Sequence, residues 1–244
     1  MSIILERSET KTVPLNPQDN QPNRDSVEAV FKVPFGKYND FNHFEGARNF
    51  IMEYDKNSEN MPDNVAPLIK KNLKESDFSI FKNDNGKLLE LKKWIADCTR
   101  DTIHVVQSPI TGIEYNTIHF VESWYHITKT NGHHESHIHP NCSWCGIYYV
   151  DSGDAGKEHG GETVFRCPFN TTYNDAGNKY IDAVGMIRVR PENGLLVLFP
   201  SYLEHYQSLY TGKKDRIVIA FNIVVLPKDT PVVDAMTGAI IETY

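Results

Sequence analysis

Hydrophobic and polar positions alternate in short runs after residue 117, and this pattern predicts β-strands. The runs are rich in β-branched and aromatic residues and are separated by Gly, Asn, Asp and Pro. The predicted strands lie near Ile118–Ser123, Tyr125–Thr130, Ser136–His139, Gly146–Val150, Glu162–Arg166, Met186–Arg190, Leu195–Phe199, Glu204–Tyr210 and Arg216–Val224. Short strands in such number, with almost no helical period, predict a β-sandwich or barrel.

The first 110 residues follow a different pattern. Residues 8–27 are polar and contain three prolines, which favours an extended arm. A helix is expected around Phe44–Tyr54, and apolar residues recurring at spacings of three and four predict another over residues 86–106. We therefore divide the chain into a mixed N-terminal region (1–110), a β core (111–228) and a C-terminal tail (229–244), with the helices bracing the sheet.

Composition narrows the class of protein. Of the 244 residues, 40% are hydrophobic and 23% charged, as in soluble globular proteins. The net charge of −7, without a basic stripe, argues against nucleic acid as a partner. The apolar runs are too short for a membrane span, the N-terminus lacks a signal-peptide pattern, and four cysteines do not indicate a disulfide framework. We expect a cytoplasmic protein with reduced thiols; the substrate and oligomeric state stay open.

Four of the ten histidines lie within residues 133–139. On a strand, the period of two would place His137 and His139 on one face, where two imidazoles can supply two ligands of a metal site. His205 is the candidate for the third ligand, because it opens a strand directly after a buried strand that ends at Pro200. Taken singly, each of these histidines could equally be solvated or cap a strand.

Arg216 opens an otherwise apolar strand. A buried guanidinium needs an anionic partner, and a carboxylate bound in bidentate fashion is the natural one. A salt bridge to an acidic side chain of the protein is the alternative explanation.

Several of these features occur in one order along the chain. They are Trp124, His137–Pro140, Cys145–Tyr149, Phe199–His205 and Arg216–Asn222. This order resembles the prolyl-hydroxylase-like 2-oxoglutarate/Fe(II) oxygenases, and more narrowly an oxygenase family common in phages and marine bacteria. The resemblance covers residues 117–225 and implies an α+β, mainly β fold: a double-stranded β-helix of the jelly-roll or cupin-like kind.

The resemblance also implies an activity and roles for site residues. His137, His139 and His205 would bind Fe(II), Arg216 would bind the far carboxylate of 2-oxoglutarate, and the Tyr149 hydroxyl would assist that carboxylate. The protein would be a dioxygenase, in the default case a hydroxylase, that couples decarboxylation of 2-oxoglutarate to oxidation of a C–H bond. The substrate, a small molecule or a protein, is not indicated.

The residue at position 139 differs from that of the wider superfamily, and this difference leaves two possible pairs of metal ligands in the histidine-rich segment. Most members have Asp or Glu two residues after the first histidine, where this chain has His139. The pair His133 and Glu135 would restore a carboxylate ligand. We favour His137 and His139 because Pro140 and the next strand follow at the family spacing. A site of three histidines would leave the iron more positive, and the sequence does not decide whether such a site is active.

Two other metal-binding functions stay open. Gly194–His205 fits the second motif of cupin enzymes that do not use 2-oxoglutarate, although no glutamate follows His137-Ile138-His139 at the cupin spacing. A zinc-binding structural module could be formed by both histidines with Cys142 and Cys145. Arg216 favours the oxygenase over both.

Overall fold

The structure is a computed structural model that describes residues 33–57, 69–106, 115–169 and 185–227. It also describes two short strands, β10 (Val232–Val233) and β11 (Ile240–Ile241), which pair with each other. The arm expected over residues 8–27 and the rest of the tail expected over 229–244 lie outside the described residues. All of the described residues belong to one compact unit.

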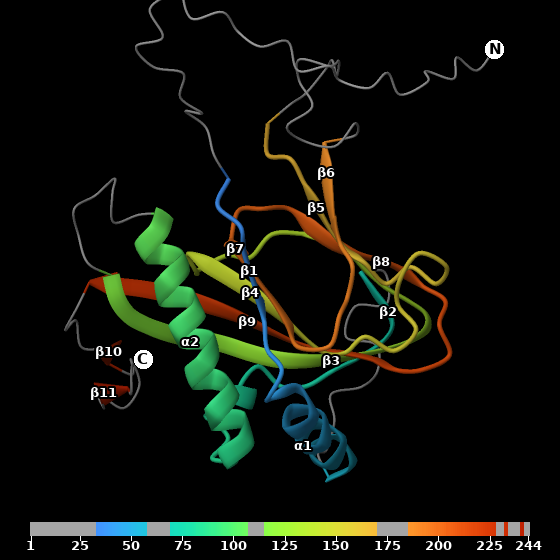
Figure 1. Ribbon diagram of the computed structural model, residues 1–244, viewed down its shortest axis with the longest axis horizontal. Helices are drawn as coiled ribbons and strands as arrows, with labels where there is room; N and C mark the ends of the chain where they lie inside the picture. The colour runs from blue at the N-terminus through green and yellow to red at the C-terminus, as the bar shows by residue number, and fades with distance from the viewer. Residues whose placement is uncertain are drawn as a thin grey trace, which may run out of the picture. The chain divides into compact units, whose positions relative to one another are not determined.

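A single long strand, β3 (Tyr115–His137), carries the chain from one half of the sheet to the other (Figure 1). Its first part pairs with β9 (Arg216–Pro227), and its end pairs with β8 (His205–Tyr210). The strand turns at Asn131, which has a φ of 64°. The three strands expected between residues 118 and 139 are therefore parts of one bent strand.

The remaining strands extend the sheet on either side of β3. The order in the nine-stranded sheet is β1-β7-β4-β9-β3-β8-β5-β6, and β2 also pairs with β3. The bounds are β1 (Gly36–Asn39), β2 (Lys70–Glu75), β4 (Trp144–Asp151), β5 (Thr163–Arg166), β6 (Met186–Val189) and β7 (Leu195–Pro200). All of these pairings are antiparallel, and the curled sheet is the expected double-stranded β-helix.

Two helices cover one face of the sheet, as expected (Figure 1). Helix α1 (Phe44–Asn57) contacts β4, and α2 (Gly86–Val106) contacts β3 and β7. A short 3-10 turn, Ile80–Lys82, precedes α2. The Asn85 side chain begins α2 by accepting hydrogen bonds from the backbone N–H groups of Lys87 and Leu88. None of the described helices has the length and apolar character needed to cross a membrane.

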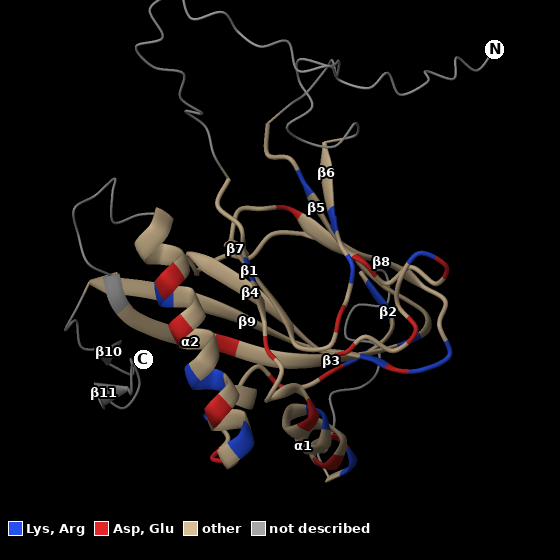
Figure 2. Ribbon diagram, viewed as in Figure 1, with Lys and Arg blue, Asp and Glu red and all other residues tan. Residues whose placement is uncertain are grey.

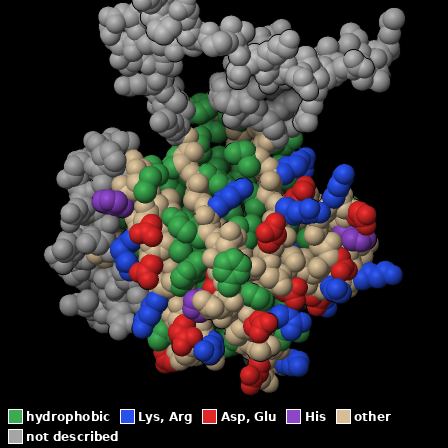
Figure 3. All heavy atoms as spheres, in the orientation of Figure 1, with side chains coloured by type: hydrophobic (Ala, Val, Ile, Leu, Met, Phe, Trp, Pro, Cys, Tyr) green, Lys and Arg blue, Asp and Glu red, His purple; other side chains and the backbone are tan. Residues whose placement is uncertain are grey.

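The core forms two apolar clusters on opposite faces of the curled sheet. One joins the helices to the sheet, with Leu91, Ile95 and Tyr148 fully buried. The other fills the interior of the β-helix, where Phe165 and Phe199 pack edge to face. On the outside, Lys and Arg are interspersed with Asp and Glu over the face in view (Figures 2 and 3).

Candidate active site

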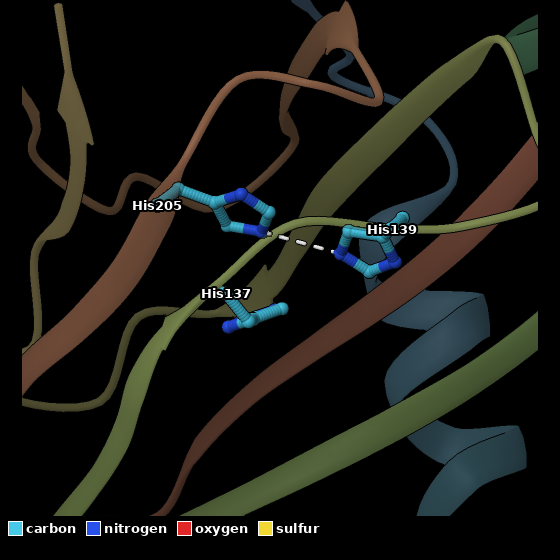
Figure 4. A group of neighbouring side chains, drawn as sticks. All are labelled: His137, His139 and His205. Carbon is cyan, nitrogen blue, oxygen red and sulfur yellow. Dashed lines mark hydrogen bonds between the residues drawn. The ribbon is translucent and has the colours of Figure 1, made fainter. Parts of the chain in front are cut away.

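The fold brings three histidines together from segments that are distant along the chain. His137 is the last residue of β3 and lies directly opposite His205, the first residue of β8. His139 follows the end of β3, where its backbone N–H donates to the carbonyl of Ser201. The candidate ligand atoms of the three side chains all lie within 4.8 Å of one another (Figure 4).

Backbone carbonyls fix the tautomers of two of these rings. Nδ1 of His137 lies 2.7 Å from the Glu135 carbonyl oxygen, and Nδ1 of His205 lies 2.9 Å from that of Leu203. Because a carbonyl can only accept, each Nδ1 carries the proton and each Nε2 keeps a free lone pair. The Nε2 atoms of His205 and His139 are 3.4 Å apart, an arrangement that suits a cation between them.

Burial favours the neutral imidazoles. It lowers the pKa of His137, that of His139 to about 4 and that of His205 to about 3. All three rings are therefore neutral near pH 7, which is the form that binds a metal ion.

Aromatic neighbours hold the histidine rings in place. The Trp124 ring stacks on His139 with a centroid distance of 6.0 Å, and His134 stacks on His137 at 4.1 Å. Phe199 packs edge-on against His205. These contacts restrict the rotamers of the three histidines, so their rings are pre-organised to bind one metal ion.

A buried polar network lies beside the histidines. The His126 ring is 2.5 Å from the Glu75 carboxylate, which also pairs with Lys70 at 2.5 Å. Burial alone would raise the pKa of Glu75, but the hydrogen bonds and charges of His126 and Lys70 outweigh it and hold that pKa at about 2. Glu75 is therefore an anion at neutral pH, and it ties β2 to the wall of the site.

The alternative histidine register lies outside this cluster. His133 pairs with Glu135 at 3.3 Å, and the Glu135 side chain is 57% exposed. Of the described residues, only His137, His139 and His205 form a group of three or more potential metal ligands. The structure thus brings His205 together with His137 and His139, the pair that we favoured, and not with His133 and Glu135.

The cysteines of the zinc hypothesis also stay outside the group. The sulfur atoms of Cys142 and Cys145 lie 3.6 Å apart, and all four cysteines are free thiols. The Cys145 thiol points to Asn222, at 3.4 Å from its side-chain oxygen. The site does not bring these two thiols and the two histidines into one ligand set.

Arg216 is fully buried without an acidic partner. Its Nη1 donates to the side-chain oxygen of Gln207 at 2.8 Å, and its guanidinium lies over the Tyr149 ring at 5.4 Å. No ion pair of the described residues includes Arg216. Nε of Arg216 and Nε2 of Gln207 are buried and lack a hydrogen-bond partner in the protein. Such orphaned donors indicate a missing acceptor.

Tyr149, to which the family resemblance assigned a role at the cosubstrate, lies beside Arg216. Its hydroxyl donates to Oγ1 of Thr163 at 2.6 Å, and the side chain is fully buried. Burial raises the pKa of Tyr149, so it is protonated at neutral pH. A hydroxyl already donating to Thr163 has only its acceptor lone pairs left, and so Tyr149 supports Arg216 through its ring face more directly than it offers a donor to a carboxylate.

The imidazoles and the guanidinium face one pocket. The residues lining it include Trp124, His126, His134, His137, His139, Cys145, Thr163, His205, Gln207 and Arg216. The pocket therefore offers both neutral nitrogen ligands and a buried cation, as a metal-bound ligand with a free carboxylate would require.

The sequence did not indicate several polar residues in or next to this pocket. Gln207 and His126 line it, and Thr128 and Glu75 contact them from behind. Gln207 had a detectable signal: it follows His205 by two positions on the same strand, and the strand period places both on one face. Glu75 had none, because β2 is a polar segment whose pairing with β3 is not visible locally.

Comparisons with known proteins support the family resemblance and the fold. Residues 122–222 match the family model described as "Putative 2OG-Fe(II) oxygenase". The fold is similar to a Pseudomonas putida prolyl-4-hydroxylase, with 14% identity, 79% of this chain and 93% of that chain covered, and a TM-score of 0.53. No curated protein matches in sequence.

Two further solved structures share the fold. A Trichoplax adhaerens prolyl hydroxylase, solved with a peptide of the hypoxia inducible factor oxygen degradation domain, is 14% identical over 78% of this chain and 83% of that chain, with a TM-score of 0.50. The non-haem α-ketoglutarate-dependent epimerase SnoN from nogalamycin biosynthesis is 9% identical over 79% of this chain and 78% of that chain, with a TM-score of 0.52. Residues 122–222 therefore resemble the 2-oxoglutarate/Fe(II) oxygenases in sequence, and the chain shares the fold of these enzymes.

Proposed function

We propose that His137, His139 and His205 bind Fe(II), and that Arg216 binds the far carboxylate of 2-oxoglutarate. The protein would then couple decarboxylation of 2-oxoglutarate to hydroxylation of a C–H bond in its substrate. The single observation that carries this proposal is the pocket that joins three neutral imidazoles to a buried guanidinium without a carboxylate partner.

The donor set fits a divalent metal ion of the first transition row. Imidazole suits Fe(II), and three protein ligands leave positions for other molecules. His139 stands where most superfamily members have a carboxylate, so all three ligands are neutral.

Asn222 hydrogen-bonds the His139 ring and raises its pKa, which offsets part of the effect of burial. Asn222 in turn donates to the Glu122 carboxylate at 2.7 Å. The Glu122 carboxylate is thus two hydrogen bonds away from His139, one of the candidate metal ligands.

The other end of the pocket fits a dicarboxylate. The Arg216 guanidinium lies over the Tyr149 ring in a buried site, where its charge attracts an anion strongly. Arg216 cannot be neutralised by a neighbouring Asp or Glu of the described chain, and so it stays available for a ligand.

The chain's residues have three tasks in such a reaction. The imidazoles hold the metal, Arg216 orients the cosubstrate, and Trp124, Phe199 and Phe165 keep the pocket apolar around the reacting atoms. When bound, iron and 2-oxoglutarate supply the oxidising chemistry with O₂, which protein side chains cannot provide.

Metal uptake by single variants tests the ligand set. We expect His137→Ala, His139→Ala and His205→Ala each to lose most of the iron that the wild type takes up anaerobically, measured by metal analysis after desalting. His133→Ala is the matched control from the same segment, and we expect it to keep full iron content. Iron loss in His133→Ala with retention in His137→Ala would overturn this ligand set in favour of the other register.

Four free cysteines support a reducing compartment for this activity. We propose on that ground that the protein acts in the cytoplasm.

A further inference from the structure

Gln207 is the polar residue of the pocket that the oxygenase motifs do not account for. It lies on β8, two residues after His205, and only 8% of it is exposed. Its backbone is registered opposite Thr163 of β5 on one side and His134 of β3 on the other. The side chain lines the pocket and contacts Arg216.

Two donors fix the orientation of the Gln207 amide. Nη1 of Arg216 donates to Oε1 at 2.8 Å, and the Thr128 hydroxyl donates to the same oxygen at 3.0 Å. A guanidinium has no acceptor, so rotating the amide by half a turn would set its NH₂ group against the Arg216 N–H. The oxygen must therefore face Nη1 of Arg216, and the NH₂ group takes the other branch of the amide.

This orientation leaves a buried NH₂ group without a partner. Nε2 of Gln207 is one of two buried side-chain atoms in the described chain that lack a hydrogen bond, and Nε of Arg216 is the other. Both residues line the same pocket. Unpaired buried donors are costly, and two adjacent ones are expected only where a ligand supplies acceptors.

We infer that Gln207 is a second binding residue for the far carboxylate of 2-oxoglutarate, with its NH₂ group donating to that carboxylate beside Arg216. This inference rests on the proposed function and extends it to a residue outside the oxygenase motifs. A neutral amide meets two requirements at once: its oxygen holds the guanidinium in place, and its nitrogen binds the ligand. A carboxylate at this position would instead neutralise Arg216 and occupy its anion site.

Binding of two keto acids that differ only at the far end tests this role without turnover. Calorimetric titration of Ni(II)-loaded protein would compare 2-oxoglutarate with 2-oxopentanoate, which has a methyl group in place of the far carboxylate. For Gln207→Met, which keeps the side-chain volume, we expect the Kd of 2-oxoglutarate to rise about 10- to 100-fold, as for loss of a hydrogen bond to a charged group. The Kd of 2-oxopentanoate should stay unchanged.

A second variant and a control complete the experiment. Gln207→Glu should bind Ni(II) normally and unfold at or above the wild-type temperature, yet bind 2-oxoglutarate no better than it binds 2-oxopentanoate. Leu209→Ala, on an exposed position of the same strand, should bind both keto acids as the wild type does.

The failure of this inference differs from the failure of the proposed function. Equal weakening of both keto acids in Gln207→Met, or no weakening of either, would overturn the role of Gln207 while leaving the cosubstrate in place. A wild-type protein that takes up Ni(II) but binds no 2-oxoglutarate would overturn both.

Discussion

Glu75 and its partners show how single residues outside the motifs shape the site. The carboxylate joins Lys70 on its own strand to the buried ring of His126 on β3. Because its pKa is held at about 2, below the ordinary value of 4.5, the folded state keeps Glu75 ionised where the unfolded chain takes up a proton. The free energy of unfolding should therefore fall as the pH drops from about 4.5 towards about 2.

The variant Glu75→Gln tests this contribution. At pH 7 we expect it to unfold with a free energy on the order of 2 kcal/mol below the wild type, because Lys70 loses its charged partner in a buried setting. The difference should shrink as the pH is lowered through the window below 4.5. Urea unfolding at a series of pH values measures it.

Glu90→Gln is the control for that experiment, since Glu90 pairs with Lys87 on the exposed face of α2. Its effect should be within about 1 kcal/mol at every pH. A Glu75→Gln protein as stable as the wild type at pH 7 would show that the network contributes nothing to the fold.

At the scale of residues, the sequence indicated the histidines and Arg216 because their surroundings are unusual: charged or metal-binding side chains next to apolar runs. It could not indicate that Gln207 and Thr128 meet at Arg216. That contact depends on the pairing of β3 with both β8 and β9, which no local pattern encodes.

At the scale of elements, the bend in β3 positions the first metal ligand. Beyond Asn131 the strand leaves β9 and joins β8, which brings His137 opposite His205. The bend requires a glycine at position 132, because the surrounding atoms leave no room for a side chain. A methyl group there would lie 2.4 Å from the Thr128 side chain and 2.7 Å and 2.8 Å from two carbonyl oxygens.

The substitution Gly132→Ala should therefore destabilise the protein and displace His137. We expect a loss of roughly 2 kcal/mol or more in the free energy of unfolding, and weaker Ni(II) binding in the protein that remains folded. Chemical denaturation and metal titration measure the two effects.

Gly86→Ala serves as the comparison, because a methyl group at Gly86 would meet no atom within 4 Å. It should change stability by less than about 1 kcal/mol and leave metal binding unchanged. Equal behaviour of the two alanine variants would contradict a structural role for the bend.

The helices and strands differ in how well the sequence predicts them. The two helices and the strands between residues 144 and 227 were predicted close to their observed bounds, because hydrophobic periods of 3.6 and 2 are local signals. Strands β1 and β2 were missed. Both are polar segments that join the sheet through backbone hydrogen bonds, and the identity of their partners is a tertiary property.

At the scale of the whole molecule, we propose that the pocket of the β-helix holds both a metal ion and a dicarboxylate. The helices and the outer core cluster brace the sheet, and the inner cluster surrounds the pocket. Metal binding alone would not separate this activity from that of a cupin enzyme without 2-oxoglutarate. The cosubstrate is therefore what must be tested.

Anaerobic titration of the Fe(II) protein with 2-oxoglutarate tests it most directly, through the visible charge-transfer band that a keto acid chelated to Fe(II) produces. We expect the band in the wild type. In Arg216→Met, which keeps the buried volume, it should be absent or require far more 2-oxoglutarate, with iron content unchanged. No band in the wild type despite stoichiometric iron would contradict 2-oxoglutarate as the cosubstrate, and an identical titration in Arg216→Met would contradict the role of Arg216.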